Sequence, residues 1–161
     1  MTPIKECEFR IAGEDDLYPI IAVGREGTEE TNYGLKFNMD HAVGYVWAYI
    51  CDNELDIIVA ILDNEVVGFA MIAVSFEFYE QPHAFLAKFW VSKAGRRSNA
   101  SRGMMGSAVA WAKKAKASHL FVTATGGLNG TEQQLFINLM KKSGFLDGGP
   151  VMSLKIESHP T

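Results

Sequence analysis

What this sequence contains little of excludes several protein classes. Only two of the 161 residues are cysteine, Cys7 and Cys51, so we expect free thiols in a reducing compartment, the cytoplasm, with a single disulfide as the alternative. No apolar run has the length of a membrane span, and the first ten residues contain no apolar core of a signal peptide. No spacing typical of metal ligands or of a nucleophile triad is present. Lysine and arginine number 15 against 19 aspartate and glutamate, so a general nucleic-acid binder is not expected.

What the sequence does contain is enough apolar material for one domain that spans residues 1–161. Hydrophobic residues make up 48% and aromatic residues 11% of the chain, so a sizeable core can form. The patterning predicts strands at residues 8–11, 56–62, 66–74, 85–91 and 119–124, with one or two more within 145–156. It predicts helices at 15–23, at 38–50, after residue 101 and at 131–142, and a loop or broken helix at 24–37. The order β-α-α-β-β-β-α-β-α-β indicates a mixed α/β sheet with helices packed on it.

The central feature is the junction between the strand at 85–91 and the helix that follows it. Residues 93–101 form a short, basic link of mostly small residues, and apolar residues recur beyond it at helical spacing, from Met104 to Ala115. A helix that begins directly after a buried strand presents unpaired backbone N–H groups and the positive end of its dipole. The junction is therefore expected to bind an anion.

These features together resemble the GNAT acyltransferase superfamily over nearly the whole chain. The resemblance is carried by the element order, the strand VVGFAMIAV at 66–74, the RRSNAS junction at 96–101, and KKSGF ahead of the closing strands. It implies an α/β (α+β) fold with a mixed, largely antiparallel central sheet and helices on both faces. It also implies acetyl-CoA as co-substrate and an amine on a small molecule or protein as acceptor, without nucleic-acid or membrane partners, and it leaves a homodimer open.

In that superfamily the link usually reads Gln/Arg-x-x-Gly-x-Gly/Ala, and its backbone N–H groups hold the pyrophosphate of acetyl-CoA. Alignment without gaps from Val91 puts Asn99 and Ser101 at the two glycine positions. Asn tolerates a left-handed backbone better than most residues, and Ser adds a hydroxyl donor. The alternatives are a register that uses Gly103 and Gly106, which leaves a short helix, and arginines that form only a solvated face. The resemblance implies cofactor contacts at Trp90, Val91, Arg96, Arg97, Ser98, Asn99, Ala100, Ser101 and Arg102.

The resemblance implies less for catalysis, because the usual acid and base positions are apolar here. It places the oxyanion contact at the backbone N–H of Val91, and it places the base and acid at positions that hold Phe85, Ala87 and Met140. Strand alternation puts His83 on the side of Val91, so His83 is the expected base, acting through water. A half-exposed histidine at a strand end is the alternative. Lys88 is expected on the opposite face.

The acceptor cleft of the superfamily is bordered by the segment between the first two helices and by the region after the third strand. Here these are residues 24–37 and 76–82, whose acidic and aromatic side chains suit a cationic or amine-bearing acceptor, unless they are only solvated loops. The expected acceptor-binding residues are Tyr33, Glu77 and Tyr79, in a rim that also includes Glu26, Glu29, Glu30, Phe37 and Glu80.

Three functions follow from these expectations. The first is an N-acyltransferase that moves acetyl from acetyl-CoA to an amine by direct attack. Without a strong base, an α-amine is the easier acceptor, because its deprotonation at pH 7 costs about 1 kcal/mol against about 5 kcal/mol for a lysine amine. The second is a GNAT-fold binding or structural protein that has lost the chemistry, with or without CoA binding. The third is an unrelated α/β binding module, which would lack an anion pocket at the junction.

Overall fold

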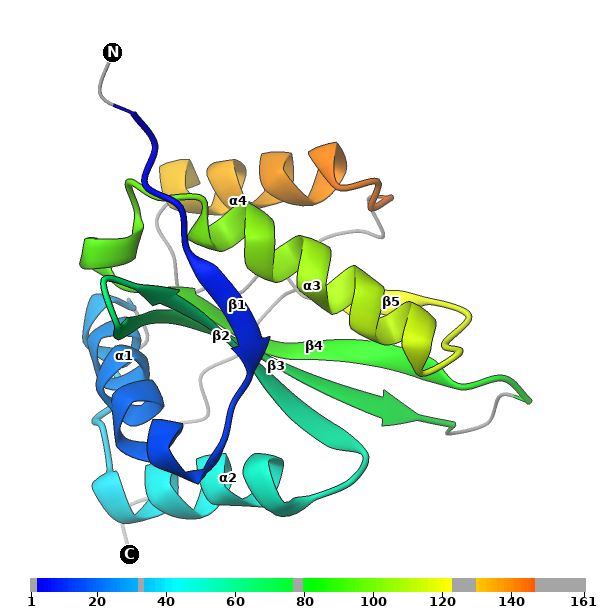
Figure 1. The fold of residues 1–161 in the computed structure, drawn as a ribbon, viewed down its shortest axis with the longest axis horizontal. Helices are drawn as coiled ribbons and strands as arrows, with labels where there is room; N and C mark the ends of the chain where they lie inside the picture. The colour runs from blue at the N-terminus through cyan, green and yellow to red at the C-terminus, as the bar shows by residue number, and fades with distance from the viewer. Residues whose placement is uncertain (1–2, 32–33, 77–79, 123–129, 147–161) are drawn as a thin grey trace, which may run out of the picture.

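The predicted order of elements recurs in the computed structural model, which describes residues 3–31, 34–76, 80–122 and 130–146 (Figure 1). The expected final strand at 151–156 lies outside the described residues. In chain order the helices and strands are β1 (Glu8–Ile11), α1 (Leu17–Glu30), α2 (Met39–Cys51), β2 (Leu55–Leu62), β3 (Glu65–Ser75), β4 (His83–Val91), α3 (Ala100–Lys114), β5 (Leu120–Val122) and α4 (Gly130–Lys142). Two short 3-10 helices, η1 (Glu14–Asp16) and η2 (Lys93–Gly95), precede α1 and α3.

The sheet is mixed and largely antiparallel, as predicted. Its strands lie in the order β1-β2-β3-β4-β5; the first four are antiparallel to their neighbours, and β5 is parallel to β4. The parallel pair is short, because β5 meets β4 only from Ala84 to Leu86. Helices α1 and α2 cover one face of the sheet and α3 and α4 cover the other, so two cores form on either side (Figure 1).

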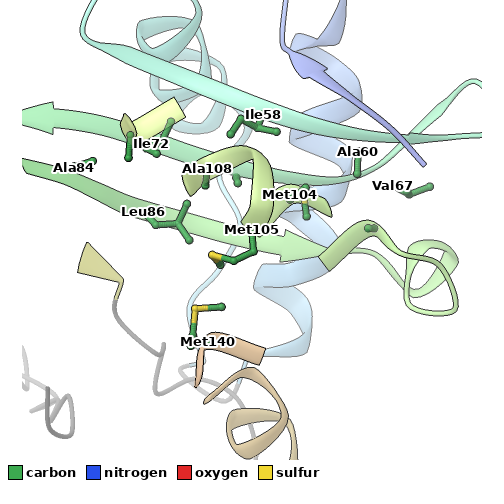
Figure 2. Packing of buried hydrophobic residues seen from close by; sticks show 13 residues of the cluster. Ile58, Ala60, Val67, Ile72, Ala84, Leu86, Met104, Met105, Ala108 and Met140 are labelled. Atoms are coloured by element: carbon green, nitrogen blue, oxygen red, sulfur yellow. The ribbon is translucent and has the colours of Figure 1, made fainter. Parts of the chain in front are cut away.

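Helix α3 begins where the preferred register expects it. The helical spacing is confirmed, since Met104, Met105 and Ala108 are fully buried against the sheet. Figure 2 shows these side chains among Ile58, Ile72 and Leu86 of the strands. The alternative register is wrong, because Gly103 and Gly106 lie inside the helix. Gly103 serves packing instead: a Cβ there would stand 1.9 Å from Cζ of Phe9.

Helix α1 is longer than expected, and the prediction of a loop or broken helix over 24–37 is wrong for its first half. The helix runs to Glu30, and Pro19 fits because it lies in the first turn, where no helical N–H bond is lost. The polar residues from Gly24 to Glu30, about two turns, remain helical because tertiary contacts hold them. Gly27 lies against the ring of Trp90, and Glu26 and Glu30 contact the junction after β4.

The hairpin between β2 and β3 was predicted correctly. Asp63 and Asn64 have φ values of 52° and 66°, which match the two left-handed positions of a type I′ turn. Helix α2 begins after Asn38, whose Oδ1 accepts the N–H of His41 at 2.9 Å. Gly144 has a φ of 91° and ends α4, while Phe145 N–H donates to the carbonyl of Met140.

Two large apolar side chains of the helices are exposed. Trp47 of α2 is 41% exposed, because Val46 and Tyr49 define the buried face. Leu135 of α4 is 64% exposed. The helix predicted at 131–142 begins one residue earlier, at Gly130.

Strand β4 contains a β-bulge that the sequence did not indicate. Met71 of β3 pairs with Lys88 and Ile72 pairs with Leu86, so Ala87 is an extra residue between them. One extra residue inverts the alternation of side chains beyond it. Leu86 therefore packs in the core under α3, whereas Lys88 and Trp90 lie on the face covered by α1 and α2.

Candidate active site

Two hollows meet at the second half of β4. The first lies between the sheet and helices α1 and α2 and has a volume of about 310 Å³. The second lies between β4, the start of α3 and α4 and has a volume of about 490 Å³. The first is lined by Ile20, Ile21, Gly24, Gly27, Thr28, Thr31, Leu35, Phe37, Ala42, Tyr45, Val46, Phe69, Met71, Lys88, Phe89 and Trp90. The second is lined by Phe89, Trp90, Val91, Arg96, Ser101, Leu135, Phe136 and Leu139.

Phe89 and Trp90 line both hollows, so the two hollows border the same two residues of β4. The indole of Trp90 is held on one side by Gly27 of α1, and the Arg96 guanidinium lies 5.9 Å from its ring centre. Its buried Nε1 donates to no acceptor among the described residues. A buried donor without a partner is rare in native proteins and is expected to meet a ligand or water.

The backbone N–H of Val91 faces the second hollow. Ser92 N–H donates to the carbonyl of Val67 in β3 at 2.8 Å. Because successive residues of a strand direct their N–H groups to opposite edges, that of Val91 points away from β3. On that side β5 covers only Ala84 to Leu86, so no described strand pairs with β4 at Val91.

The junction after β4 is held in shape by the N-terminal segment. Asn99 N–H donates to the carbonyl of Lys5 at 3.0 Å, and the Oδ1 of Asn99 accepts the N–H of Cys7 at 2.7 Å. The N–H of Ala100 donates to Oγ of Ser98 at 3.1 Å. The backbone donors of Asn99 and Ala100, which the sequence placed in the anion cradle, are thus already used within the protein.

Helix α3 offers other donors one and two residues further on. Ser101 and Arg102 lie in its first turn, and their N–H groups make no hydrogen bond within the part of the chain that the structure describes. Ser101 also lines the second hollow. The side chains of Arg97 and Arg102 are exposed beside this turn. Backbone donors and positive charge thus lie together at the N-terminus of a 15-residue helix, an arrangement that favours anions.

Arg96 is directed toward α1 rather than left free at the junction. Its guanidinium forms an ion pair with Glu30, and Lys93 Nζ lies 3.2 Å from the other carboxylate oxygen. Burial acts to raise the pKa of Glu30, but hydrogen bonds from Arg96 and Lys93 outweigh it, so this pKa lies below its ordinary value. Glu30 therefore stays ionised and fixes α1 to the junction.

None of the described acidic residues of the expected rim lines the first hollow. Glu26 accepts the backbone N–H of Lys93 at 2.6 Å, and Glu29 pairs with Arg25 at 3.0 Å, while Glu30 binds Arg96 and Lys93. Phe37 is a lining residue, as the sequence suggested. The expected acceptor-binding residues Tyr33, Glu77 and Tyr79 lie outside the described residues.

The structure does not bring His83 to Val91. The two residues are eight positions apart on β4, which is about 26 Å along a strand. The bulge at Ala87 also puts them on opposite faces, so the predicted shared face is wrong. His83 is 2% exposed, and its ring lies 4.8 Å from that of Phe85 and 5.7 Å from that of Phe121.

Lys88 lies on the face opposite Val91, as expected. What the sequence did not indicate is that this face borders the first hollow, which Lys88 lines beside Phe89 and Trp90. Among the residues that the structure describes, no group of three metal-binding side chains lies together, and no helix is long and apolar enough to cross a bilayer.

Comparison with known proteins gives a family match and structural neighbours. The model of the acetyltransferase (GNAT) family matches residues 29–145. A transcriptional regulator from Bacillus halodurans C-125 superposes with a TM-score of 0.75 at 16% identity, over 93% of this chain and 99% of that one. The aminoglycoside acetyltransferase AAC(6')-Iy, in complex with the bisubstrate analog CoA-S-monomethyl-acetylneamine, gives 0.72 at 13% identity, over 94% and 99%. An aminoglycoside acetyltransferase from an uncultured soil metagenomic sample, in complex with sisomicin, gives 0.70 at 15% identity, over 95% and 97%. A search of curated proteins by sequence found no match.

Proposed function

The chain belongs to the GNAT acetyltransferase family, which uses acetyl-CoA as co-substrate, and on this premise we propose that it transfers acetyl from acetyl-CoA to an amine. The observation that carries the proposal is the meeting of two hollows at Phe89 and Trp90. A transferase for two substrates needs two binding spaces that open onto one reacting point. The second hollow is assigned to the cofactor and the first to the acceptor.

The cofactor assignment rests on charge and on backbone donors. The N–H groups of Ser101 and Arg102 would hold the pyrophosphate at the start of α3, with the Arg97 and Arg102 side chains adding positive charge. Phe136 and Leu139 of α4 would contact the apolar arm of the cofactor along the second hollow. Ser98, Asn99 and Ala100 would act as positioning residues, because their polar groups hold the junction itself. Arg96 would position Trp90 and α1.

The groups that take part in acetyl transfer are then the backbone N–H of Val91 and the amine of the acceptor. In the proposal, the Val91 N–H donates to the thioester oxygen as negative charge develops there. The amine nitrogen bonds to the acetyl carbon, the carbon–sulfur bond breaks, and its electrons leave on sulfur. A thiolate with a pKa of about 8.5 can leave unprotonated at pH 7 for about 2 kcal/mol, so no acid is required at the apolar position of Met140. The proton of the amine passes to solvent.

The proposal is tested by measuring cofactor binding and turnover separately. Isothermal titration calorimetry with acetyl-CoA is expected to give a dissociation constant in the micromolar range. Thiol release is then followed over a panel of α-amines, lysine amines, polyamines and aminoglycosides, the last because two neighbours act on that class. A folded protein that binds no acetyl-CoA would overturn the assignment of the second hollow.

A second function, binding without acyl transfer, is favoured by one observation. Among the described residues that line the first hollow, only Lys88 and Tyr45 carry a titratable side chain, and neither is a carboxylate or histidine. Acetyl-CoA binding without thiol release over the whole amine panel would select this second function. Release that follows the fraction of neutral amine as pH rises would select the transferase.

A further inference from the structure

The first hollow has an unusual distribution of charge. Its described lining is largely apolar and aromatic, from Ile20 and Phe37 through Phe69 to Met71. The one charged side chain in that lining, within the part of the chain that the structure describes, is Lys88. Lys88 is exposed, so its ammonium group is accessible from solvent, and an amine acceptor, which carries positive charge before it reacts, gains no attraction from it.

Nothing in the described structure neutralises Lys88. It makes no ion pair and no hydrogen bond with any residue that the structure describes. The acidic residues at the end of α1 bind other groups: Glu26 accepts the backbone N–H of Lys93, Glu29 pairs with Arg25, and Glu30 pairs with Arg96 and Lys93. The ammonium group of Lys88 therefore remains available to a ligand.

From this arrangement we propose that the acceptor is an amine with an apolar or aromatic body and a carboxylate close to its nitrogen, and that Lys88 binds the carboxylate. The inference rests on the proposed function, because it names the acceptor of the same site. The apolar lining would take the body of the acceptor by burying it from water. The lysine supplies a charge-assisted hydrogen bond to the carboxylate, which a simple amine cannot use.

The spacing on β4 fits a small acceptor. Lys88 and Trp90 are two residues apart on the same face, so their Cα atoms lie about 6.6 Å apart along the strand. In the proposal, a carboxylate bound by Lys88 would leave room for its neighbouring nitrogen beside Phe89 and Trp90, which line the same hollow. A volume of about 310 Å³ is at the small end for ligand pockets, which suits an amino-acid-sized molecule.

The charge pattern also separates this acceptor class from polycationic amines. A polyamine or an aminoglycoside presents several positive charges, and the first hollow offers them a lysine and no carboxylate among its described lining residues. Like charges brought together in a partly buried pocket disfavour binding. We therefore expect aromatic amino acids to bind most tightly, the matching amine without a carboxylate less tightly, and polyamines most weakly.

The test compares matched ligands on the full-length protein, by calorimetry with saturating CoA present. The ligands are phenylalanine, 3-phenylpropionate, which lacks the amine, phenethylamine, which lacks the carboxylate, and spermidine. The variants are Lys88→Met, which removes the charge at similar length, Lys88→Glu, which reverses it, and the control Lys113→Met, an exposed lysine near the C-terminus of α3.

We expect phenylalanine and 3-phenylpropionate to bind at least about ten-fold more tightly than phenethylamine, as one charge-assisted hydrogen bond would give. Lys88→Met should remove the difference, Lys88→Glu should reverse it, and Lys113→Met should leave it unchanged. Equal or tighter binding of phenethylamine to the unmodified protein overturns the inference, as does binding of none of the four ligands. Retained preference in Lys88→Met overturns it as well.

Turnover measured on the same ligands separates this inference from the proposed function. Lys88-dependent binding of phenylalanine without thiol release would leave the inference in place and remove the transferase. Acetylation of spermidine or phenethylamine, unaffected by Lys88→Met, would leave the transferase in place and remove the inference.

Discussion

Gly27 of α1 and Trp90 of β4 are in direct contact, with no room for a side chain between them. A Cβ at position 27 would stand 2.7 Å from Cδ2 and 2.8 Å from Cε2 of the indole. Trp90 lines both hollows, and the glycine determines where its ring can lie. A glycine in the middle of a helix weakens it, and its presence here is explained by this approach.

Gly27→Ala is expected to disturb stability and the site together. The methyl group forces the indole to move, which costs about 1 to 3 kcal/mol as overpacking, against a gain in helix propensity of about 1 kcal/mol. Urea unfolding should show lower stability, and acetyl-CoA binding should weaken as Trp90 shifts. The matched control is Gly44→Ala in α2, where a Cβ meets no atom within 4 Å, so only the stabilising propensity gain is expected. Equal behaviour of the two variants would contradict the role given to Gly27.

The double variant Arg97→Ala, Arg102→Ala is expected to weaken acetyl-CoA binding by about ten-fold or more, since each arginine adds a charge-assisted contact to the phosphates. Its control is Lys113→Ala, Lys114→Ala, which removes the same charge from the opposite end of the same helix. Calorimetry at two salt concentrations should show that the arginine effect shrinks as salt rises. Equal losses of acetyl-CoA affinity in both double variants would mean that the net charge of the protein, and not a site at the α3 N-terminus, attracts the cofactor.

The ion pair between Arg10 and Asp16 predicts a pH dependence of stability. Arg10 donates to both oxygens of Asp16, at 2.6 and 2.9 Å, and Gly13 N–H donates at 2.8 Å. The hydrogen bond from Arg10 is the main cause that lowers the pKa of Asp16, and burial opposes it. A lowered pKa means that the stabilisation is complete above the ordinary value of 3.8 and is lost as pH falls below it.

Asp16→Asn should therefore cost about 1 to 3 kcal/mol at pH 7 and progressively less below pH 4. The measurement is urea unfolding of both proteins at several pH values. A difference that stays constant down to pH 2 would show that the carboxylate charge is not its source. Asp15→Asn, one residue earlier and exposed, is the control and should change stability little.

Most of the fold could be predicted from the sequence, because the patterns that indicate it involve residues close together in the chain. The apolar runs of β2 and β3, the Asp63-Asn64 turn and the apolar spacing of α3 each depend on a few neighbouring residues. The bulge at Ala87 and the persistence of α1 past Gly24 depend on partners far along the chain. Sequence reasoning therefore assigned the wrong face to His83, and treated Glu26 and Glu30 as a free acidic rim when they hold the junction.

Asn99 illustrates how a degenerate motif can keep the shape of a junction by different contacts. It occupies a position where the superfamily usually has glycine, and it was expected to adopt a left-handed backbone. Its φ is −82°, so no glycine-like conformation is needed. The side chain instead accepts the N–H of Cys7, which attaches the N-terminal segment to the start of α3.

Asn99→Gly, although it restores the usual residue, is thus expected to lower stability by about 1 kcal/mol and not to tighten acetyl-CoA binding. The reason is that Cys7 N–H loses its acceptor while the donors at Ser101 and Arg102 are unchanged. Asn99→Asp keeps an acceptor at the same place and should retain most of the stability. The measurements are urea unfolding and calorimetric titration with acetyl-CoA, on the unmodified protein and on the two variants. Tighter cofactor binding by Asn99→Gly at unchanged stability would mean that the bond to Cys7 closes a site that glycine leaves open.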